Sequence, residues 1–179
     1  MKDLGLLGPA HTYHDLARAT FLATLSYSFF NSFEEIFTAL KKGEIKQALV
    51  AVNNNNAGIV GDNQKVIDKE GFKQLEHFDL PIHLCLGSKT KLTLNQVKKI
   101  YSHPMAIKET QDYFSKYRHI TFISTTSTAV AIDEMKHNKK DSVAVISSKS
   151  AIESSKLHLI AEDIQDHKNN MTTFCLIAL

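Results

Sequence analysis

The sequence predicts an α/β protein with two lobes, and three observations support this. Short apolar runs alternate along the chain with segments of helical spacing. Residues 48–52 are apolar at every position, as in a strand covered on both faces of a parallel sheet. Pro81 then interrupts the pattern, and a fresh series of strands and helices follows it. We therefore expect a second lobe to begin near this proline.

The composition excludes several classes of protein. With 43% hydrophobic and 22% charged residues in 179, the chain has the composition of an ordinary soluble globular protein. Its net charge is +2 and its lysines are scattered, which argues against nucleic acid as a partner. No apolar run is long enough to span a bilayer or to form a signal-peptide core. We therefore expect a cytoplasmic protein with no membrane partner.

The first lobe should alternate strands and helices, and two of the helices are marked by capping residues. Thr12 precedes a helical pattern, and Ser32 with Glu35 forms a capping box before another. The expected elements are strand 4–7, a helix after Thr12, strand 25–30, a helix from Ser32 to near Gly43, strand 48–52, helix 64–70 and strand 72–78.

The second lobe should repeat this alternation. Pro104 fits a first helical position, and the apolar spacing from Ala106 to Tyr117 predicts one continuous helix. The other expected elements are strand 97–101, strand 120–123, a helix with Ile132 and Met135, strand 143–146, strand 157–160, a polar crossing over 162–170 and a last strand over 172–179. Cys85 and Cys175 lie in apolar runs, so we expect buried free thiols.

Hydroxyl, amide and imidazole groups recur where expected strands end and helices begin. A helix N-terminus offers unpaired N–H groups and the positive end of its dipole, so several such junctions could together bind a small anion. Each of these residues, taken alone, is better explained as a helix cap, and it is their shared location at strand ends that favours an anion site. The residues are Thr12, Asn54, Ser102 with His103, and Thr126 with Ser127.

Short motifs along nearly the whole chain occur in a recognisable order and spacing. They are Leu7-Gly8-Pro9 with Thr12-Tyr13, Asn54 to Gly58, Leu80-Pro81-Ile82, Tyr101-Ser102-His103-Pro104, Thr126-Ser127 with Ala129, and Asn170-Met171-Thr172-Thr173-Phe174. In these motifs the chain resembles the catalytic domain of prephenate dehydratases. The resemblance implies two Rossmann-like lobes of the periplasmic-binding-protein type with a cleft between them. The first lobe would contain residues 1–78 plus 162–179, and the second residues 79–161.

The resemblance also implies an activity. Prephenate dehydratases are lyases of phenylalanine biosynthesis that convert prephenate to phenylpyruvate with loss of water and carbon dioxide, without a metal or redox cofactor. The hydrogen-bond donor that assists departure of the ring hydroxyl would be Thr172. Family members are commonly dimeric, and because the sequence ends at Leu179 no regulatory ACT domain is expected. Residues expected to bind the small dicarboxylate substrate are Asn54, Asn55, Ser102, His103, Thr126, Ser127, Thr12, Thr173 and Phe174.

The chain also departs from the family pattern. Asn53 replaces a glutamate and Thr173 an arginine, while His11 stands where a glycine is expected. Losing the glutamate and the arginine together leaves the net charge unchanged, which suggests that these two residues form a coupled pair in the family. The only arginines, Arg18 and Arg118, are not evident substitutes for the lost one.

Two alternatives to a dehydratase follow from these departures. One is an enzyme resembling prephenate decarboxylases, which lose carbon dioxide without aromatising the ring. The other is a catalytically silent protein that binds a small anion. His11 and His14 could share a helix face, but no third ligand is placed by the sequence, so no metal site is expected.

Overall fold

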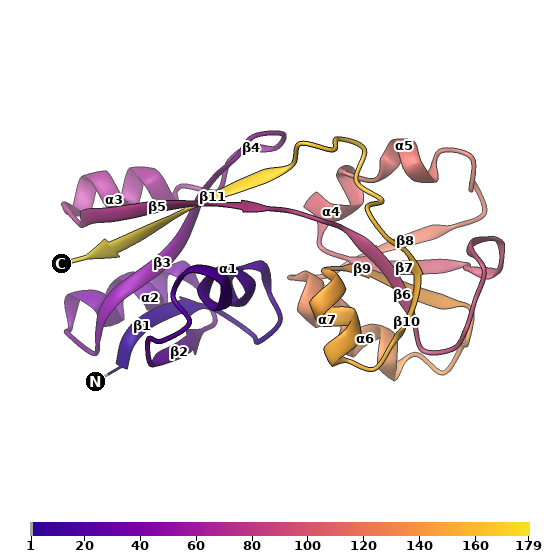
Figure 1. Cartoon of the computed structure of the whole chain (residues 1–179), viewed down its shortest axis with the longest axis horizontal. Coiled ribbons are helices and arrows are strands. Elements are labelled where there is room, and N and C mark those ends of the chain that lie inside the picture. Colours follow the sequence, from indigo (N-terminus) through magenta and orange to yellow (C-terminus); the bar gives the residue numbers. More distant parts are fainter. Residues whose placement is uncertain (1) are drawn as a thin grey trace. The chain divides into compact units, whose positions relative to one another are not determined.

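The computed structural model describes residues 2–179 and divides them into two compact units (Figure 1). The first unit contains the chain up to Ile82 together with Asn170–Leu179, and the second contains His83–Asn169. Each unit holds one β-sheet covered by helices, so the predicted mixed α/β fold with two sheets is confirmed. Within the described residues, no helix combines the length and the apolar character needed to cross a bilayer.

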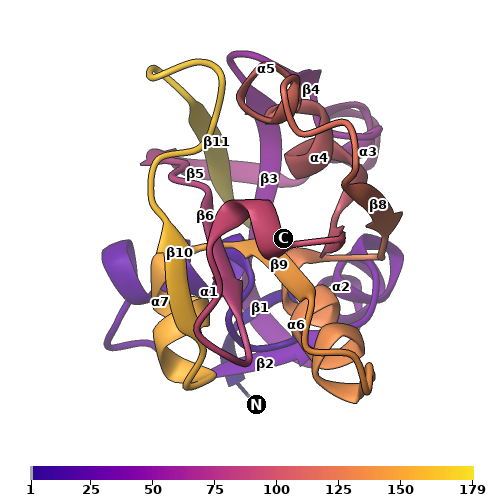
Figure 2. The same cartoon turned by 90° about the vertical axis from the view of Figure 1, so that its right-hand side faces the viewer.

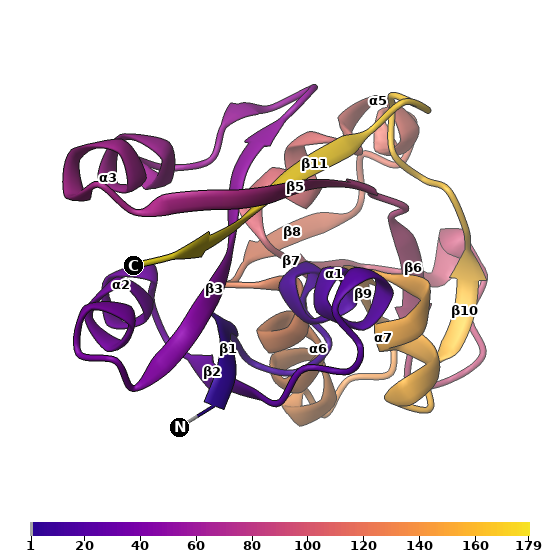
Figure 3. The ribbon, with the colours of Figure 1, turned by 60° about the vertical axis from the view of Figure 1, so that its left-hand side comes forward.

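The first unit is built on a six-stranded sheet of order β2-β1-β3-β11-β5, with β4 paired to β3 (Figure 3). β1 runs parallel to β2 and β3, whereas β11 runs antiparallel to β3 and β5. The expected parallel sheet is therefore a mixed one. The strands are β1 (Lys2–Leu7), β2 (Tyr27–Phe30), β3 (Ile45–Asn54), β4 (Gly58–Ile59), β5 (Lys73–Pro81) and β11 (Met171–Ala178).

Helices cover both faces of this sheet. α2 (Phe33–Lys41) and α3 (Asn63–Glu70) enclose the main core, in which Val50 and Val52 pack with Cys175. The alternate residues of β3 and β11 face the other way, and there α1 (Tyr13–Phe21) packs its His14 ring 5.1 Å from the ring of Phe174. This alternation determines which polar side chains share a face at the end of the sheet.

The predicted caps explain where two of these helices begin. Thr12 and Ser32 each accept a hydrogen bond from the backbone N–H three residues on, as an N-cap residue does. The capping box at Ser32 is only half formed, because the Glu35 carboxylate accepts the N–H of Asn31 rather than that of Ser32. Both cysteines are buried free thiols, as predicted.

The second unit has a five-stranded sheet of order β10-β6-β9-β7-β8 (Figure 2). β7, β8 and β9 are parallel, while β6 runs antiparallel to β9 and β10. The elements are β6 (Cys85–Ser88), a 3-10 turn (Leu94–Gln96), β7 (Lys99–Ser102), α4 (Pro104–Lys108), α5 (Gln111–Phe114), β8 (Thr121–Ser124), α6 (Thr128–His137), β9 (Val143–Ser147), α7 (Lys149–Ser154) and β10 (His158–Ala161).

The prediction of one continuous helix from Ala106 to Tyr117 is wrong, because the chain forms two short helices there, α4 and α5. Between them, the Thr110 hydroxyl donates to carbonyls of the preceding turn. The Asp166 carboxylate then accepts the N–H groups of Asp112 and Tyr113 and so caps the second helix. Apolar spacing alone could not predict a break that depends on an acid so distant in the sequence.

The chain passes between units later than expected at both crossings. β5 continues to Pro81, which pairs with Met171 in the sheet of the first unit. The returning segment 162–169 belongs to the second unit, where the Ile164 N–H donates to the Leu84 carbonyl at 2.9 Å. The Gln165 side chain in turn accepts the N–H of Leu84. These hydrogen bonds keep the returning chain with the second unit up to Asn169.

Candidate active site

Two of the predicted site residues meet at one edge of the first sheet. β3 ends at this edge and β11 begins there, with Asn54 and Thr172 as register partners. The Asn54 amide donates to Thr172 Oγ1 at 3.0 Å and to Asn170 Oδ1 at 2.8 Å. All three side chains are buried. The sequence placed Asn54 and Thr172 in one site, but Asn170 was missed as a member of it although it belongs to the same terminal motif.

The asparagine run after β3 holds the Asn54 amide in one orientation. Its Oδ1 accepts the backbone N–H groups of Asn56 and Ala57 at 2.9 and 2.8 Å, which leaves its nitrogen directed at Thr172. The predicted residue Asn55 accepts the Met171 N–H at 2.8 Å and so ties the loop to β11. Because Thr172 Oγ1 is the acceptor in its bond with Asn54, its own hydroxyl proton is not used in that bond.

The first turn of α1 lies over the same face of the sheet. Thr12 is buried, donates to the Leu7 carbonyl at 3.2 Å and caps α1. Two residues on, His14 Nε2 accepts the Ala51 N–H. Burial lowers the pKa of His14 to about 4, so this histidine is neutral near pH 7. Phe174, expected to touch substrate, is 1% exposed and packs against His14 as a core residue.

Thr173 lies on the opposite face from Thr172, because successive strand residues alternate. Its hydroxyl donates to Asp79 Oδ1 at 2.6 Å on β5. On its other side, Thr173 is the direct register partner of Asn53 on β3. The two departures from the family pattern are therefore cross-strand neighbours, which supports the hypothesis of a coupled pair. Neither lies on the face that carries Thr172.

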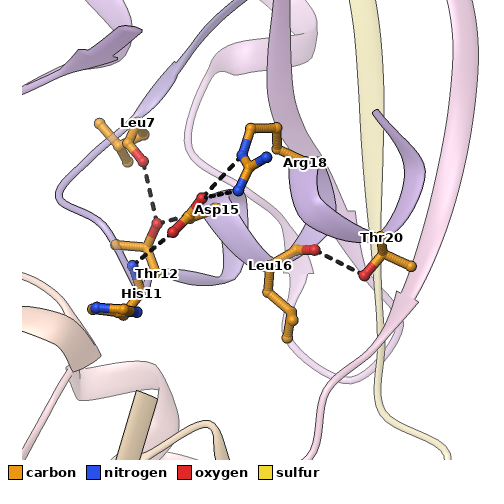
Figure 4. Close-up of polar contacts among 7 residues, drawn as sticks. All are labelled: Leu7, His11, Thr12, Asp15, Leu16, Arg18 and Thr20. Atoms are coloured by element: carbon orange, nitrogen blue, oxygen red, sulfur yellow. Dashed lines mark hydrogen bonds and ion pairs between the residues drawn. The ribbon is translucent and has the colours of Figure 1, made fainter. Parts of the chain in front are cut away.

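Arg18 is held in place by its own helix (Figure 4). Its guanidinium donates twice to Asp15 Oδ1, at 3.0 and 2.8 Å, and lies 4.2 Å from the centre of the Tyr27 ring. The other oxygen of Asp15 accepts the N–H of His11, whose φ of 68° is left-handed. Glycine adopts this conformation without strain, which explains why the family pattern has glycine at this position. Arg18 thus supports the loop before α1.

The expected site residues of the second unit gather at the carboxyl ends of its parallel strands. Ser102 is fully buried and donates to the Ile146 carbonyl at 2.8 Å, so it joins two strands. His103 caps α4 by accepting the Met105 N–H on Nδ1, and burial lowers the pKa of its imidazole. The neutral ring therefore carries its proton on Nε2, as a donor. Ser127 caps α6 by accepting the Val130 N–H at 3.0 Å, and the adjacent Thr126 is exposed.

The two histidines that could have shared a helix face do not do so. His11 is exposed in the loop before α1, whereas His14 is buried against the sheet. In the described part of the chain, no group of three or more His, Cys, Asp or Glu side chains is arranged to hold a metal ion.

Comparison with known proteins identifies the family to which the chain belongs. A family model described as prephenate dehydratase matches residues 4–179. The chain belongs to the prephenate dehydratase family. A prephenate dehydratase of Lactococcus lactis subsp. cremoris (strain MG1363) is 30% identical over 177 residues, which cover 97% of this chain and 62% of the relative.

Solved structures show the same fold. The prephenate dehydratase from Arthrobacter aurescens, in complex with L-Phe, matches with a TM-score of 0.88 at 20% identity, over 98% of this chain and 60% of that one. A periplasmic substrate-binding protein of an ABC transporter from Coxiella burnetii matches with a TM-score of 0.52 at 11% identity, over 98% and 84%. The fold is therefore shared by prephenate dehydratases and periplasmic binding proteins. The chain spans about half the length of the curated bifunctional chorismate mutase/prephenate dehydratases that it matches, 49% of the relative from Buchnera aphidicola and 46% of that from Escherichia coli.

Proposed function

We propose that the chain catalyses the decarboxylative dehydration of prephenate to phenylpyruvate, a step of phenylalanine biosynthesis. The observation that carries the proposal is the hydrogen-bonded pair of Asn54 and Thr172 at a strand-end edge, in a chain of the prephenate dehydratase family. In the family pattern, Thr172 occupies the position of the hydrogen-bond donor and Asn54 that of a substrate-binding residue.

The proposed chemistry assigns one role to each member of the pair. The C–C bond to the ring carboxylate breaks and releases carbon dioxide, and its electron pair moves through the ring to expel the hydroxyl group. Thr172 donates its hydroxyl proton to that departing oxygen, which leaves as water, and Thr172 regains a proton from solvent. The Asn54 amide, by donating to Thr172 Oγ1, stabilises negative charge that develops on this oxygen. Aromatisation supplies the driving force, so the step requires no redox partner.

The second unit supplies donors suited to a carboxylate. His103 offers its Nε2–H in the neutral state, and the N-terminus of α6 offers backbone N–H groups beside Thr126 and Ser127. We assign binding of the substrate's carboxylates to these groups. Ser102 contributes by holding β7 against β9 rather than by touching substrate.

The departures at Asn53 and Thr173 do not displace this assignment. Both positions lie on the face of the sheet opposite to Thr172, so the Asn54–Thr172 hydrogen bond is formed without the family's glutamate and arginine. This placement favours dehydration over a decarboxylase that leaves the ring non-aromatic and over a silent anion-binding protein.

Incubation of the purified protein with prephenate, with identification of the products, tests the proposal. We expect phenylpyruvate from the native protein and a loss of about 10²- to 10⁴-fold in rate in Thr172→Ala, the usual contribution of a positioned proton donor. Thr20→Ala is the matched control, since Thr20 is exposed on α1 and donates only to its own helix. A non-aromatic keto acid would instead indicate decarboxylation, and unchanged prephenate would indicate a binding protein.

A further inference from the structure

One buried hydroxyl in the second unit has no hydrogen-bond partner. Ser147, the last residue of β9, is 0% exposed, and within residues 2–179 no group lies in position to bond its Oγ. Two other fully buried serines of the same sheet are satisfied: Ser88 donates to the Thr90 carbonyl at 2.6 Å and Ser102 to that of Ile146. Buried polar groups are nearly always paired, so an unpaired one calls for an explanation.

The position of Ser147 suggests which partner is lacking. β7, β8 and β9 are parallel, so Ser147 ends its strand at the same edge as Ser102 and the residues that follow β8. Val143 and Val145 pack in the core formed with α6, and alternation along β9 puts Ser147 on that same face. Tyr101, the register partner of Val145, also packs there, so His103 follows on this face of β7.

Two groups at this edge, the first turn of α6 and His103, offer hydrogen-bond donors, while the carboxylates of Glu162 and Asp163 lie near Cys85, the register partner of Ser147. α6 follows β8 directly and therefore begins here, with Ser127 as its cap and a length of ten residues. Its first turn provides N–H groups and the positive end of the helix dipole. His103 provides Nε2–H, because its Nδ1 already accepts a hydrogen bond. Donors arranged in this way are suited to an anion rather than a cation.

We infer that Ser147 is a further ligand-binding residue, whose hydroxyl donates to a carboxylate bound at the start of α6. This role rests on the proposed function. It adds Ser147, at the end of β9, to the binding residues that follow β7 and β8. The Oγ is fully buried, so a ligand can reach it only after a side-chain rearrangement that uncovers it. The ligand then satisfies a group that the folded chain leaves unpaired.

The inference makes an unusual pair of predictions for Ser147→Ala. Removing an unpaired buried hydroxyl should leave the unfolding temperature of the ligand-free protein unchanged or higher. The same substitution should weaken the binding of prephenate by about ten- to a hundredfold, the usual effect of losing a hydrogen bond to a charged group. If Ser147 had only a structural role, Ser147→Ala would lower the unfolding temperature and leave the affinity for prephenate unchanged.

The test compares prephenate affinity by calorimetry with thermal unfolding in the native protein, Ser147→Ala, Ser147→Cys and Ser88→Ala. Cysteine keeps the shape of serine but is a weak donor, so it should lose affinity like alanine. Ser88→Ala is the matched control, because it removes a buried and satisfied hydroxyl that lies towards the other end of the sheet. It should lower the unfolding temperature and leave affinity unchanged.

Equal affinity in Ser147→Ala and the native protein would overturn the inference. So would a loss of stability in Ser147→Ala as large as that in Ser88→Ala, since it would reveal a protein partner for the hydroxyl. A native protein that binds prephenate without forming phenylpyruvate would contradict the proposed function alone, and the affinity comparison would still decide the role of Ser147. A native protein that does not bind prephenate would contradict both.

Discussion

The polar edges of the two sheets are held together in different ways. In the first unit, Asn54 reaches across the sequence to Asn170 and Thr172, 116 and 118 residues away, and its amide bonds leave it one orientation. In the second unit, His103 and Ser127 bond to N–H groups only two and three residues ahead. The first edge is fixed by long-range contacts, as a group that acts on a reacting atom should be. Under the proposed function, the second edge presents donors from local caps to a charged group of the substrate.

The largest effect on the reaction rate should come from a substitution of Asn54, whose hydrogen bonds hold the polar edge of the first sheet. Asn54→Asp keeps the size of the side chain but removes the nitrogen that donates to Thr172 Oγ1. We expect the rate of phenylpyruvate formation to fall about 10²- to 10³-fold, as when one donor to a developing oxyanion is lost. Steady-state kinetics should show the loss in kcat. A change confined to KM would mean that Asn54 only binds substrate.

A second prediction concerns His14 of α1, which packs against Phe174 on the face of the first sheet that carries Thr172. Its folded pKa of about 4 lies below the ordinary 6.5, so between these values the unfolded chain binds a proton that the folded chain does not. The stability due to neutral His14 is complete above pH 6.5 and is lost as the pH falls to 4, roughly 3 kcal/mol in all.

Denaturant unfolding of the native protein and of His14→Gln between pH 4 and 7 measures this contribution. Glutamine can accept the Ala51 N–H without titrating, so its unfolding free energy should depend less steeply on pH. Identical slopes for the two proteins would show that folding does not lower the pKa of His14.

Ser127, an N-cap at the polar edge of the second sheet, can be compared directly with Ser32, an N-cap in the first unit. Ser127→Ala should destabilise the protein by about 1 kcal/mol, the usual cost of losing an N-cap, and should also weaken prephenate binding. Ser32→Ala removes an equivalent cap from α2 in the first unit and should cost a similar amount without changing affinity. Equal affinities in the two variants would show that the start of α6 does not hold the ligand.

The smallest expected effect lies on the face away from Thr172. Restoring the family's residues as Asn53→Glu and Thr173→Arg places opposite charges on register partners. A double-mutant cycle on the unfolding free energy should show a favourable coupling of about 0.2–1 kcal/mol. Thr173→Arg alone should be tolerated, because Asp79 is its other cross-strand neighbour. No coupling would mean that the two departures are independent.

Local patterns predicted most of the fold, because strands, caps and helical faces are encoded within a few residues. Thr12 and Ser32 begin their helices as their sequences predict. The break between α4 and α5 was not predictable in this way, because it requires Asp166 from a distant segment.

The candidate site was harder to predict from the sequence, because its contacts also join segments that are distant in the chain. Asn54 and Thr172 could be assigned to one site only through the family resemblance, since their contact joins distant strands. The buried position of Phe174 and the orientation of Thr173 depend on the register of β11, which periodicity alone does not give. Ser147 carried no signal, because the lack of a partner is a property of the folded chain.

The most direct test of the central claim is a kinetic cycle between Asn54 and Thr172. If Asn54 acts through the Thr172 hydroxyl, the rate of phenylpyruvate formation in Asn54→Asp/Thr172→Ala should be no lower than in Thr172→Ala alone, because the group that Asn54 serves is already gone. Losses that multiply in the double variant would contradict the account, since they would show that the two residues act on the substrate independently.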